Sequence, residues 1–213
     1  MERYISENKI KSLLHEMIKT GDNLYYNDKN HSLYSYKEQK KQNIIRLPLI
    51  WHAIPEIISN KMNIESIKRC NKHYLIIMIT TGQASIGIFK NKENFEHKVI
   101  RKYMVRKKQG KSQLKYLKTK GKSRAGSRVR LNNSLVFFEE INEYINKWNE
   151  DYEICRILYF VPKSLINLWF NSNKTPFFNK DDSNLIKIPY NLDTPTFELM
   201  KKVGKYAYDG EIL

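Results

Sequence analysis

The chain has 213 residues, of which 41% are hydrophobic, and it carries 38 Lys and Arg against 22 Asp and Glu. The formal net charge of +16 argues against a neutral metabolic enzyme and predicts a polyanionic partner, most often nucleic acid. The length and the hydrophobic share fit one large domain, or one domain with an extension.

Three other classes of protein are disfavoured by local features. The longest apolar runs, such as YLIIMI at 74–79, have the length of a strand and are far shorter than a membrane span. The start, MERYISENK, has an early acid and no hydrophobic run, unlike a secretory signal. Cys70 and Cys155 form no CxxC pair and the five histidines are scattered, so we expect neither a disulfide framework nor a metal site. These features predict a cytoplasmic protein without a membrane segment, metal or cofactor.

The first 50 residues contain one clear element. Residues 6–20 are predicted to form an amphipathic helix, because Ser6 can cap its start and Gly21 can close its end. Its apolar face consists of Ile10, Leu13, Leu14, Met17 and Ile18. The polar stretch GDNLYYNDKNHS that follows predicts a loop, and the loose alternation over 32–50 predicts either a hairpin or a docking segment.

Strand patterns become strong after residue 70. YLIIMI at 74–79 and ASIGIFK at 84–90 flank TTGQ, which predicts a β-hairpin around a glycine turn. FEHKVIRKYMV at 95–105 is a third candidate strand. A helix is predicted after residue 133 from apolar residues at helical spacing, namely Phe137, Ile141, Tyr144, Ile145 and Trp148.

The last third of the chain alternates strands and helices. CRILYFV at 155–161 predicts a buried strand, 162–168 a short helix and LIKIP at 185–189 another strand. Thr194 and Pro195 are predicted as the cap and first residue of a last helix. This order favours an α+β fold in which a mixed β-sheet is flanked by helices.

A long basic loop is predicted over residues 106–133, where no periodic pattern is visible. From Arg101 to Arg130 there are 13 Lys or Arg residues and no Asp or Glu, so subtracting them from +16 leaves +3 for the rest of the chain. Loops of this length inside a compact domain are usually functional or disordered. Like charges would repel one another in the free protein and could order against phosphates, in a salt-sensitive interaction.

A short motif that ends in a neutral amide, Gly110-Lys111-Ser112-Gln113, lies within this loop. Gly110 permits a positive φ and close approach of the backbone to a ligand. Gln113 offers a donor and an acceptor but no titratable proton, so it can orient water and substrate without acting as a general base. A loop that only docks on RNA would not need this motif, although composition alone leaves that interpretation open.

In order and spacing, these motifs resemble the release-factor-like VLRF domain of the Vms/ANKZF-type peptidyl-tRNA hydrolases. That domain is related to the catalytic, middle domain of eukaryotic and archaeal class-1 release factors. Residues 74–113 resemble its strand, turn, strand, His-Lys, Tyr-x-Val-Arg and Gly-x-(Ser/Ala)-Gln series. RAGSRVRLNN at 124–133 resembles its Ser-Ala-Gly segment and the Leu-Arg-Arg-Tyr-Asn-Glu that follows. IPYNLDTPTFELMKKV at 188–203 resembles its closing Ile-Pro, Pro-Thr-Phe and helix, so the resemblance covers about 70–206.

The resemblance implies a free-standing, bacterial member of this family. Residues 70–213 would form the catalytic domain, with a fold like the release-factor middle domain, and residues 1–69 a helical and extended N-terminal extension. Gln113 would be catalytic, and Gly110, Lys111 and Ser112 would form the turn that presents it. The expected RNA-binding residues are Arg106, Lys107, Lys108, Lys115, Lys118, Lys120, Lys122, Arg124, Arg128, Arg130 and Asn133.

Departures from the family pattern occur in both motifs. Ser112 replaces the second glycine of the release-factor Gly-Gly-Gln loop, as is usual in the VLRF branch. Leu131, Asn132 and Ser134 occupy positions where the family has an Arg, a Tyr and a Glu, so no family role is carried over to them.

The function implied by the resemblance is ribosome rescue. The protein would act as a monomer on the large subunit and peptidyl-tRNA. It would release nascent chains by ester hydrolysis or by endonucleolytic cleavage near the 3′ CCA end of the tRNA. The alternative is a non-catalytic ribosome- or RNA-binding module whose basic loop only docks.

Other candidate residues are interpreted as structural. TTGQ at 80–83 is expected to be a turn, Gln109 a loop contact, and His97 and Tyr103 packing or hydrogen-bonding residues. No paired carboxylates share a helix face, which predicts surface positions for Asp151, Glu153, Asp181 and Asp182. The 14 Tyr and 9 Phe are expected to fill the core, while base stacking on some of them stays open without a location.

Overall fold

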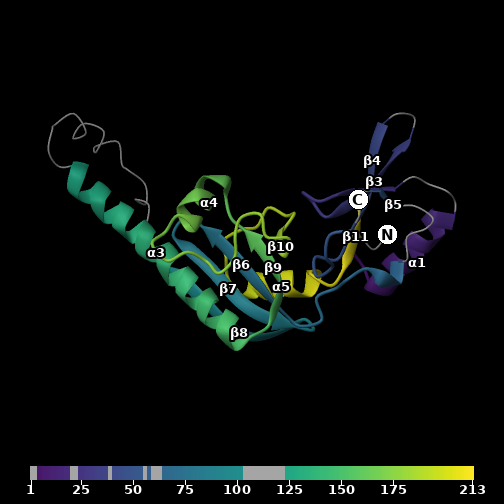
Figure 1. Ribbon diagram of the computed structural model, residues 1–213. Coiled ribbons are helices and arrows are strands. Elements are labelled where there is room, and N and C mark those ends of the chain that lie inside the picture. Colours follow the sequence, from purple (N-terminus) through teal and green to yellow (C-terminus); the bar gives the residue numbers. More distant parts are fainter. Residues whose placement is uncertain (1–3, 20–23, 38–39, 55–56, 59–63, 103–122) are drawn as a thin grey trace.

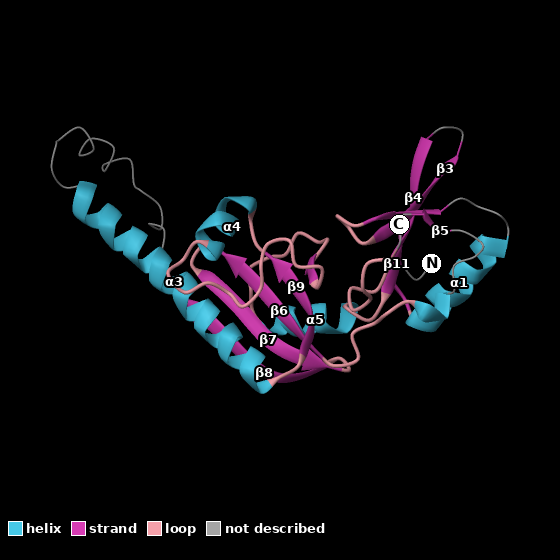
Figure 2. Ribbon diagram, in the orientation of Figure 1, coloured by secondary structure: helices cyan, strands magenta, loops and turns pink. Residues whose placement is uncertain are grey.

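The computed structural model describes residues 4–19, 24–37, 40–54, 57–58, 64–102 and 123–213 (Figure 1). Two β-sheets define two lobes that lie side by side. The larger lobe is built on the sheet of residues 73–101, 154–160 and 185–187, and the smaller, N-terminal lobe on the other sheet. Helices accompany both sheets, as the colouring by secondary structure shows (Figure 2).

The larger lobe has a five-stranded sheet in the order β10-β9-β6-β7-β8. Its strands are β6 (His73–Thr80), β7 (Gln83–Lys90), β8 (Glu93–Arg101), β9 (Ile154–Phe160) and β10 (Leu185–Lys187). The first three form an antiparallel meander, whereas β9 runs parallel to both β6 and β10. The predicted α+β class with a mixed sheet is therefore confirmed.

Helices cover both faces of this sheet. The alternation of side chains along β6 divides the core, because Leu75, Ile77 and Ile79 lie in one hydrophobic cluster and Tyr74, Ile76 and Met78 in the other. The first cluster includes residues of α3 (Ser123–Asp151) and α4 (Lys163–Phe170), and the second includes residues of α5 (Phe197–Tyr206). The second cluster also continues into the N-terminal lobe, so one core joins the lobes.

The N-terminal lobe has a six-stranded sheet in the order β1-β11-β4-β3-β2-β5. Its strands are β1 (Tyr4–Ile5), β2 (Leu24–Asn27), β3 (Ser32–Lys37), β4 (Lys40–Arg46), β5 (Ile57–Ile58) and β11 (Gly210–Ile212), with α1 (Glu7–Lys19) and the 3-10 turn η1 (Ile64–Ser66) beside them. The C-terminal strand β11 pairs with β1 and β4, and thus closes the chain back onto its start. The predicted domain boundary after residue 69 stays a prediction.

A buried ion pair holds β11 in place. Arg46 Nε donates to Glu211 Oε2 at 3.4 Å, and both side chains are only 2% exposed. The remaining guanidinium nitrogens donate to the carbonyl oxygens of Leu47 and Asp209, each at 2.8 Å. Tyr190 also donates its hydroxyl to Glu211 at 2.9 Å. These bonds compensate the cost of removing two charges from water.

A buried histidine lies in the same lobe. Pro48 O can only accept, so His31 donates from Nε2 at 2.9 Å and its Nδ1 accepts from the Tyr26 hydroxyl at 2.7 Å. Burial, together with the nearby positive charge of Arg156, lowers the pKa of His31 to about 3. Arg156 on β9 in turn donates to Leu49 O at 3.0 Å, which connects the two lobes.

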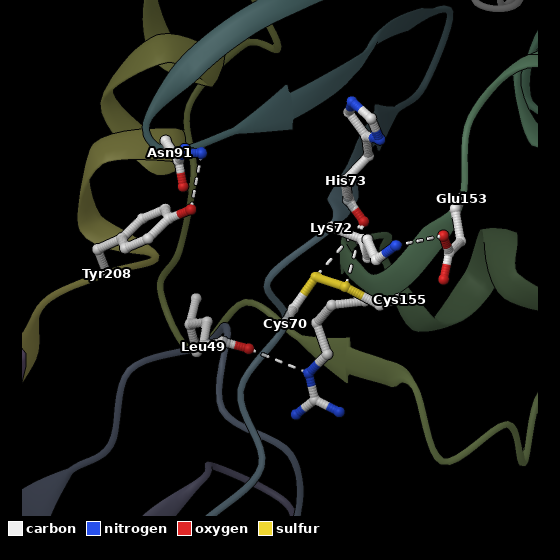
Figure 3. Close-up of a disulfide and its surroundings, with 9 residues drawn as sticks. Leu49, Cys70, Lys72, His73, Asn91, Glu153, Cys155 and Tyr208 are labelled. Atoms are coloured by element: carbon white, nitrogen blue, oxygen red, sulfur yellow. Dashed lines mark hydrogen bonds and ion pairs between the residues drawn. A yellow bond between two sulfur atoms is a disulfide. The ribbon is translucent and has the colours of Figure 1, made fainter.

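Cys70 and Cys155 form a disulfide, so the expectation that no disulfide framework is present was wrong (Figure 3). Cys70 precedes β6 and Cys155 lies on β9, and these strands are parallel neighbours. Their Cα atoms are 5.5 Å apart although 85 positions separate them in the sequence. Spacing along the chain could not show this proximity. The Lys72–Glu153 ion pair, 2.8 Å long, joins the same two segments.

Most predicted elements are confirmed. The expected helix over 6–20 is α1, the hairpin interpretation of 32–50 is β3 and β4, and the three strands after residue 70 are β6, β7 and β8. The strand, short helix and strand of the last third are β9, α4 and β10. None of the helices in the described part of the chain is long and apolar enough to cross a bilayer.

β8 runs from Glu93 to Arg101, and residues 103–105 of the strand predicted over 95–105 lie outside the described residues. Three local predictions were wrong. Part of the expected loop over 21–32 is strand β2, which pairs with β3. The cap of α5 is Thr196, whose hydroxyl accepts from Leu199 N at 3.1 Å, and not Thr194.

The third correction concerns the basic loop, which does not extend to residue 133. Residues 123–133 are helical because α3 begins at Ser123. Arg, Leu and Ala are strong helix formers, and a helix already anchored further along its length propagates more easily than it nucleates.

Candidate functional site

The predicted catalytic segment joins the end of β8 to the start of α3. Gln113 and the turn Gly110, Lys111 and Ser112 lie outside the described residues. So do the basic residues Arg106, Lys107, Lys108, Lys115, Lys118, Lys120 and Lys122. The structure therefore describes the two elements that the segment connects, the end of β8 and α3, which we call its supports.

The first support is the end of β8. Lys102 N donates to Gly82 O at 2.9 Å, so the backbone stays attached to the β6–β7 turn up to this residue. Gly82 has φ 80°, a conformation that glycine adopts without steric cost. Lys102 Nζ also forms an ion pair with Glu140 of α3 at 2.9 Å. The start of the segment is thus fixed to both the sheet and the helix.

The second support is α3. Its packed part is anchored by apolar residues that are nearly fully buried against the sheet, namely Phe137, Phe138, Ile141, Ile145 and Trp148. The N-terminal end of α3 extends past the sheet (Figure 1), and the basic segment precedes it in the sequence. At 1.5 Å per residue, 123–134 add roughly 18 Å of helix. Of the predicted RNA-binding residues, Arg124, Arg128, Arg130 and Asn133 have their backbone on this extension, and their side chains lie outside the description.

A buried amide that the sequence interpretation missed fixes α3 against α4. Asn142 Oδ1 accepts from Trp169 Nε1 at 2.8 Å. Its Nδ2 donates to Lys174 O at 2.6 Å and to Ser172 Oγ at 3.0 Å. In the sequence, the buried position of Asn142 could have been inferred only from its place next to Ile141 on the apolar face of the predicted helix. Because each hydrogen bond requires its donor and acceptor to face each other, this network fixes the orientation of α3 relative to α4.

Glu96 of β8 binds the other end of α3. Its carboxylate accepts from Trp148 Nε1 at 2.6 Å and from the Tyr152 hydroxyl at 2.7 Å. The hydrogen bond to the carboxylate raises the pKa of Tyr152, since it stabilises the protonated phenol. In addition, Lys98 Nζ lies 5.0 Å from the ring centroid of Tyr144. β8 and α3 therefore form one rigid unit at the base of the segment.

Two alternative candidates have the structural roles predicted for them. His97 stacks on Phe197 with 3.7 Å between ring centroids and pairs through Nδ1 with Asn94 Oδ1 at 3.1 Å. Gln83 ends the TTGQ turn opposite Thr80, and its Nε2 donates to Pro195 O at 2.6 Å. Tyr103 and Gln109 lie outside the described residues.

The four acids considered for a nuclease site lie at the surface. Asp151, Glu153 and Asp181 are exposed, and Asp182 is partly exposed, accepting from Asn184 N at 2.8 Å. Within the ranges that the structure covers, no three His, Cys, Asp or Glu side chains come close enough to hold a metal ion.

Comparison with protein families gives one match. The family described as Bacteroidetes VLRF1 release factor matches residues 74–208, which is more than half of the chain. No curated protein matches the chain.

Solved structures show weak overall similarity. A structure titled "Vms1 mitochondrial localization core" is 14% identical, with a TM-score of 0.44, over 98% of this chain and 84% of that one. A Pelota structure from Archaeoglobus fulgidus is 13% identical, with a TM-score of 0.34, over 96% of this chain. The present chain spans 63% of that Pelota chain.

Proposed function

The chain belongs to the family of Bacteroidetes VLRF1 release factors, and from this premise we propose that it is a ribosome-rescue factor which releases nascent chains from stalled peptidyl-tRNA. One observation carries the proposal. The matched region, 74–208, includes the whole basic segment with its Gly110-Lys111-Ser112-Gln113 motif.

The partners in this proposal are the large ribosomal subunit and the tRNA bound to it, in the cytoplasm, with the protein acting as a monomer. Thirteen basic residues between Arg101 and Arg130, without an acid among them, fit a path lined by phosphates. Each phosphate contact releases counterions, so binding should weaken steeply with salt. The rigid unit of β8 and α3 supports delivery of the segment, since a firm base limits the directions in which it can leave the domain.

In the first of two routes, the nascent chain is released by hydrolysis of the ester between the peptide and the terminal ribose. A water must be positioned for attack, and donors must face the oxyanion that develops on the carbonyl oxygen. We assign both tasks to the side-chain amide and backbone N–H of Gln113. An amide cannot accept the proton of the water at neutral pH, so RNA hydroxyls take over proton transfer. Gly110 would let the backbone approach the substrate closely.

The experiment is single-turnover peptide release from peptidyl-tRNA on isolated large subunits. Gln113→Ala should lower the release rate by about 10²–10³-fold, the usual cost of losing one such electrostatic contact. Binding to the subunit should be retained, because the charge of the segment is unchanged. Gln109→Ala is the matched control, as it removes another amide from the same segment and should release at nearly the wild-type rate.

The outcomes separate three functions. Unchanged release by Gln113→Ala would refute the catalytic assignment of Gln113, whereas binding without release by the wild-type chain would leave a docking module. An intact CCA end on the released tRNA, resolved on a sequencing gel, identifies ester hydrolysis. A shortened tRNA identifies endonucleolytic cleavage instead.

A further inference from the structure

Three tyrosines share one face of the N-terminal sheet. On β2 and β3 the pair Tyr26 and Leu33 points into the core, with 8% and 0% exposure. The next pair, Tyr25 and Tyr34, therefore lies on the opposite face, and Tyr36 follows two positions later on that face. We call Tyr25, Tyr34 and Tyr36 the tyrosine face.

The rings of the tyrosine face form one connected cluster. Tyr25 and Tyr34 are stacked with centroids 5.5 Å apart and planes 23° from parallel. Tyr36 meets both edge-on, at 5.5 Å from Tyr25 and 5.8 Å from Tyr34. It is nevertheless 58% exposed, whereas Tyr25 and Tyr34 are partly buried. A large part of an aromatic ring is thus held in a fixed position and open to solvent.

Positive charge accompanies these rings. Lys41 of β4 is the cross-strand partner of Tyr36 in the register of β3 and β4. Lys37 and Lys40 pair at the end of the same hairpin, and Glu38 is the one acid in residues 34–43. The combination of aromatic rings and cations predicts an anionic partner with planar groups.

Cross-strand aromatic pairs also stabilise hairpins, which is the simpler explanation of this cluster. That explanation accounts for the stacked pair of Tyr25 and Tyr34. It does not account for Tyr36, because a ring that served only to stabilise the strands would gain most by being buried. β3 and β4 stand out from the rest of their lobe, so the exposed ring is accessible to a large partner (Figure 1).

We propose that the tyrosine face binds single-stranded RNA, with unpaired bases stacking on the rings and the hairpin lysines contacting phosphates. Every base has a π-face, so stacking tolerates any sequence, whereas paired bases in a duplex cannot reach the rings. The inference rests on the proposed function only for the source of the RNA, which would be a single-stranded stretch of rRNA or tRNA.

The tyrosine face lies far from the N-terminal end of α3 (Figure 1), which follows the basic segment in the sequence. The hairpin belongs to the N-terminal lobe, and the projecting end of α3 lies on the other side of the larger lobe (Figure 1). Two separated contacts with one RNA partner raise the overall affinity through effective concentration. The tyrosine face would therefore add to ribosome affinity without taking part in the chemistry of release.

The test measures binding of the full chain to a fluorescein-labelled 12-nucleotide oligouridylate and to an RNA duplex of the same length. Tyr36→Ile introduces a β-branched residue suited to a strand but removes the ring, and should weaken oligouridylate binding roughly tenfold. Tyr36→Phe keeps the ring and should bind as wild type does. Duplex binding should not change in either variant, because it depends on charge. Unchanged oligouridylate binding by Tyr36→Ile, or an equal loss for duplex, would overturn the proposal.

A second measurement covers the case in which Tyr36→Ile fails to fold, judged from its melting curve. Oligouridylate containing 4-thiouridine is cross-linked to the wild-type chain, and the modified peptides are mapped. Cross-links on peptides of β2 and β3 support the tyrosine face, and their absence rejects it. If Tyr36→Ile loses ribosome binding but keeps oligouridylate binding, the partner is a protein and the proposal is wrong. Gln113→Ala should leave oligouridylate binding unchanged, so failure of the release mechanism is distinguishable from failure of this inference.

Discussion

Asn142 and Gln113 are two neutral amides whose roles are recognised from different information. Gln113 can be recognised from the sequence because it lies shortly after a glycine within a cationic segment. A neutral amide in such a segment seldom serves only for packing. Asn142 has no motif around it, and its importance depends on Trp169 and Lys174, which lie 27 and 32 positions away. Chemistry that is local in sequence can be predicted, whereas a network closed by tertiary contacts cannot.

Loss of the Asn142 amide should destabilise the fold. Asn142→Ala leaves the indole N–H of Trp169 buried without its acceptor, which costs about 1–3 kcal/mol in the free energy of unfolding. Urea denaturation followed by tryptophan fluorescence measures the change. Asn146→Ala, one turn further along α3, removes an exposed bond to Thr175 O and should cost less than about 1 kcal/mol. Equal costs for the two variants would show that the buried network contributes little.

At the scale of elements, the strand and helix periods were sufficient to locate most of the fold. β6 and β7 are continuous runs of buried residues and the packed part of α3 has buried residues at helical spacing, and all three were predicted near their observed places. The extension of α3 over 123–134 has no such pattern, since it lies beyond the sheet. This stretch was predicted as a loop because apolar residues recur at helical spacing only where one face of a helix is buried. A helix that extends past the sheet does not need such an apolar stripe.

The α3 extension provides a test of how the basic segment is delivered. Arg128→Pro removes a helix N–H and its ring clashes with the carbonyl of residue 124, at a local cost of about 3 kcal/mol. The helical circular dichroism at 222 nm should fall and peptide release should slow. The urea midpoint should stay nearly the same, because the substitution leaves untouched the deeply buried side chains that the structure describes on α3, from Phe137 to Trp148.

Arg128→Ala is the control for the lost charge. It preserves the helix, so it should release faster than Arg128→Pro and keep the wild-type circular dichroism. If both variants release at the same rate, delivery does not require a helical extension.

For the whole molecule, the two ends of the chain are joined in one lobe. β11 lies between β1 and β4, and the hydrophobic core of the N-terminal lobe continues to β6 and α5. The sequence predicted an N-terminal extension and a catalytic domain as separate units. The structure adds that residues 210–212 complete the N-terminal sheet, so the C-terminal end of the chain helps to stabilise its beginning.

The buried ion pair of Arg46 and Glu211 makes this dependence measurable. Glu211→Ala leaves a buried guanidinium without its counter-charge and should lower the free energy of unfolding by about 3–5 kcal/mol. Glu198→Ala removes an acid of the same type from an exposed pair with Lys201 and should cost less than about 1 kcal/mol. Urea denaturation of both variants gives the comparison. A small loss of free energy of unfolding for Glu211→Ala would mean that the hydrogen bonds to Leu47 O and Asp209 O are sufficient to stabilise the buried guanidinium of Arg46.

The sequence by itself determined the class of fold, the order of most elements, the concentration of charge before α3 and the resemblance to a release-factor family. Each of these features depends on residues that are close together in the sequence. Tertiary structure alone decided the disulfide of Cys70 and Cys155, the bridging role of Asn142, the place of β11 and the exposure of Tyr36. Each of these depends on which distant segments pack together. A side chain's own period can indicate that it is buried, but only the folded chain brings its partner within bonding distance.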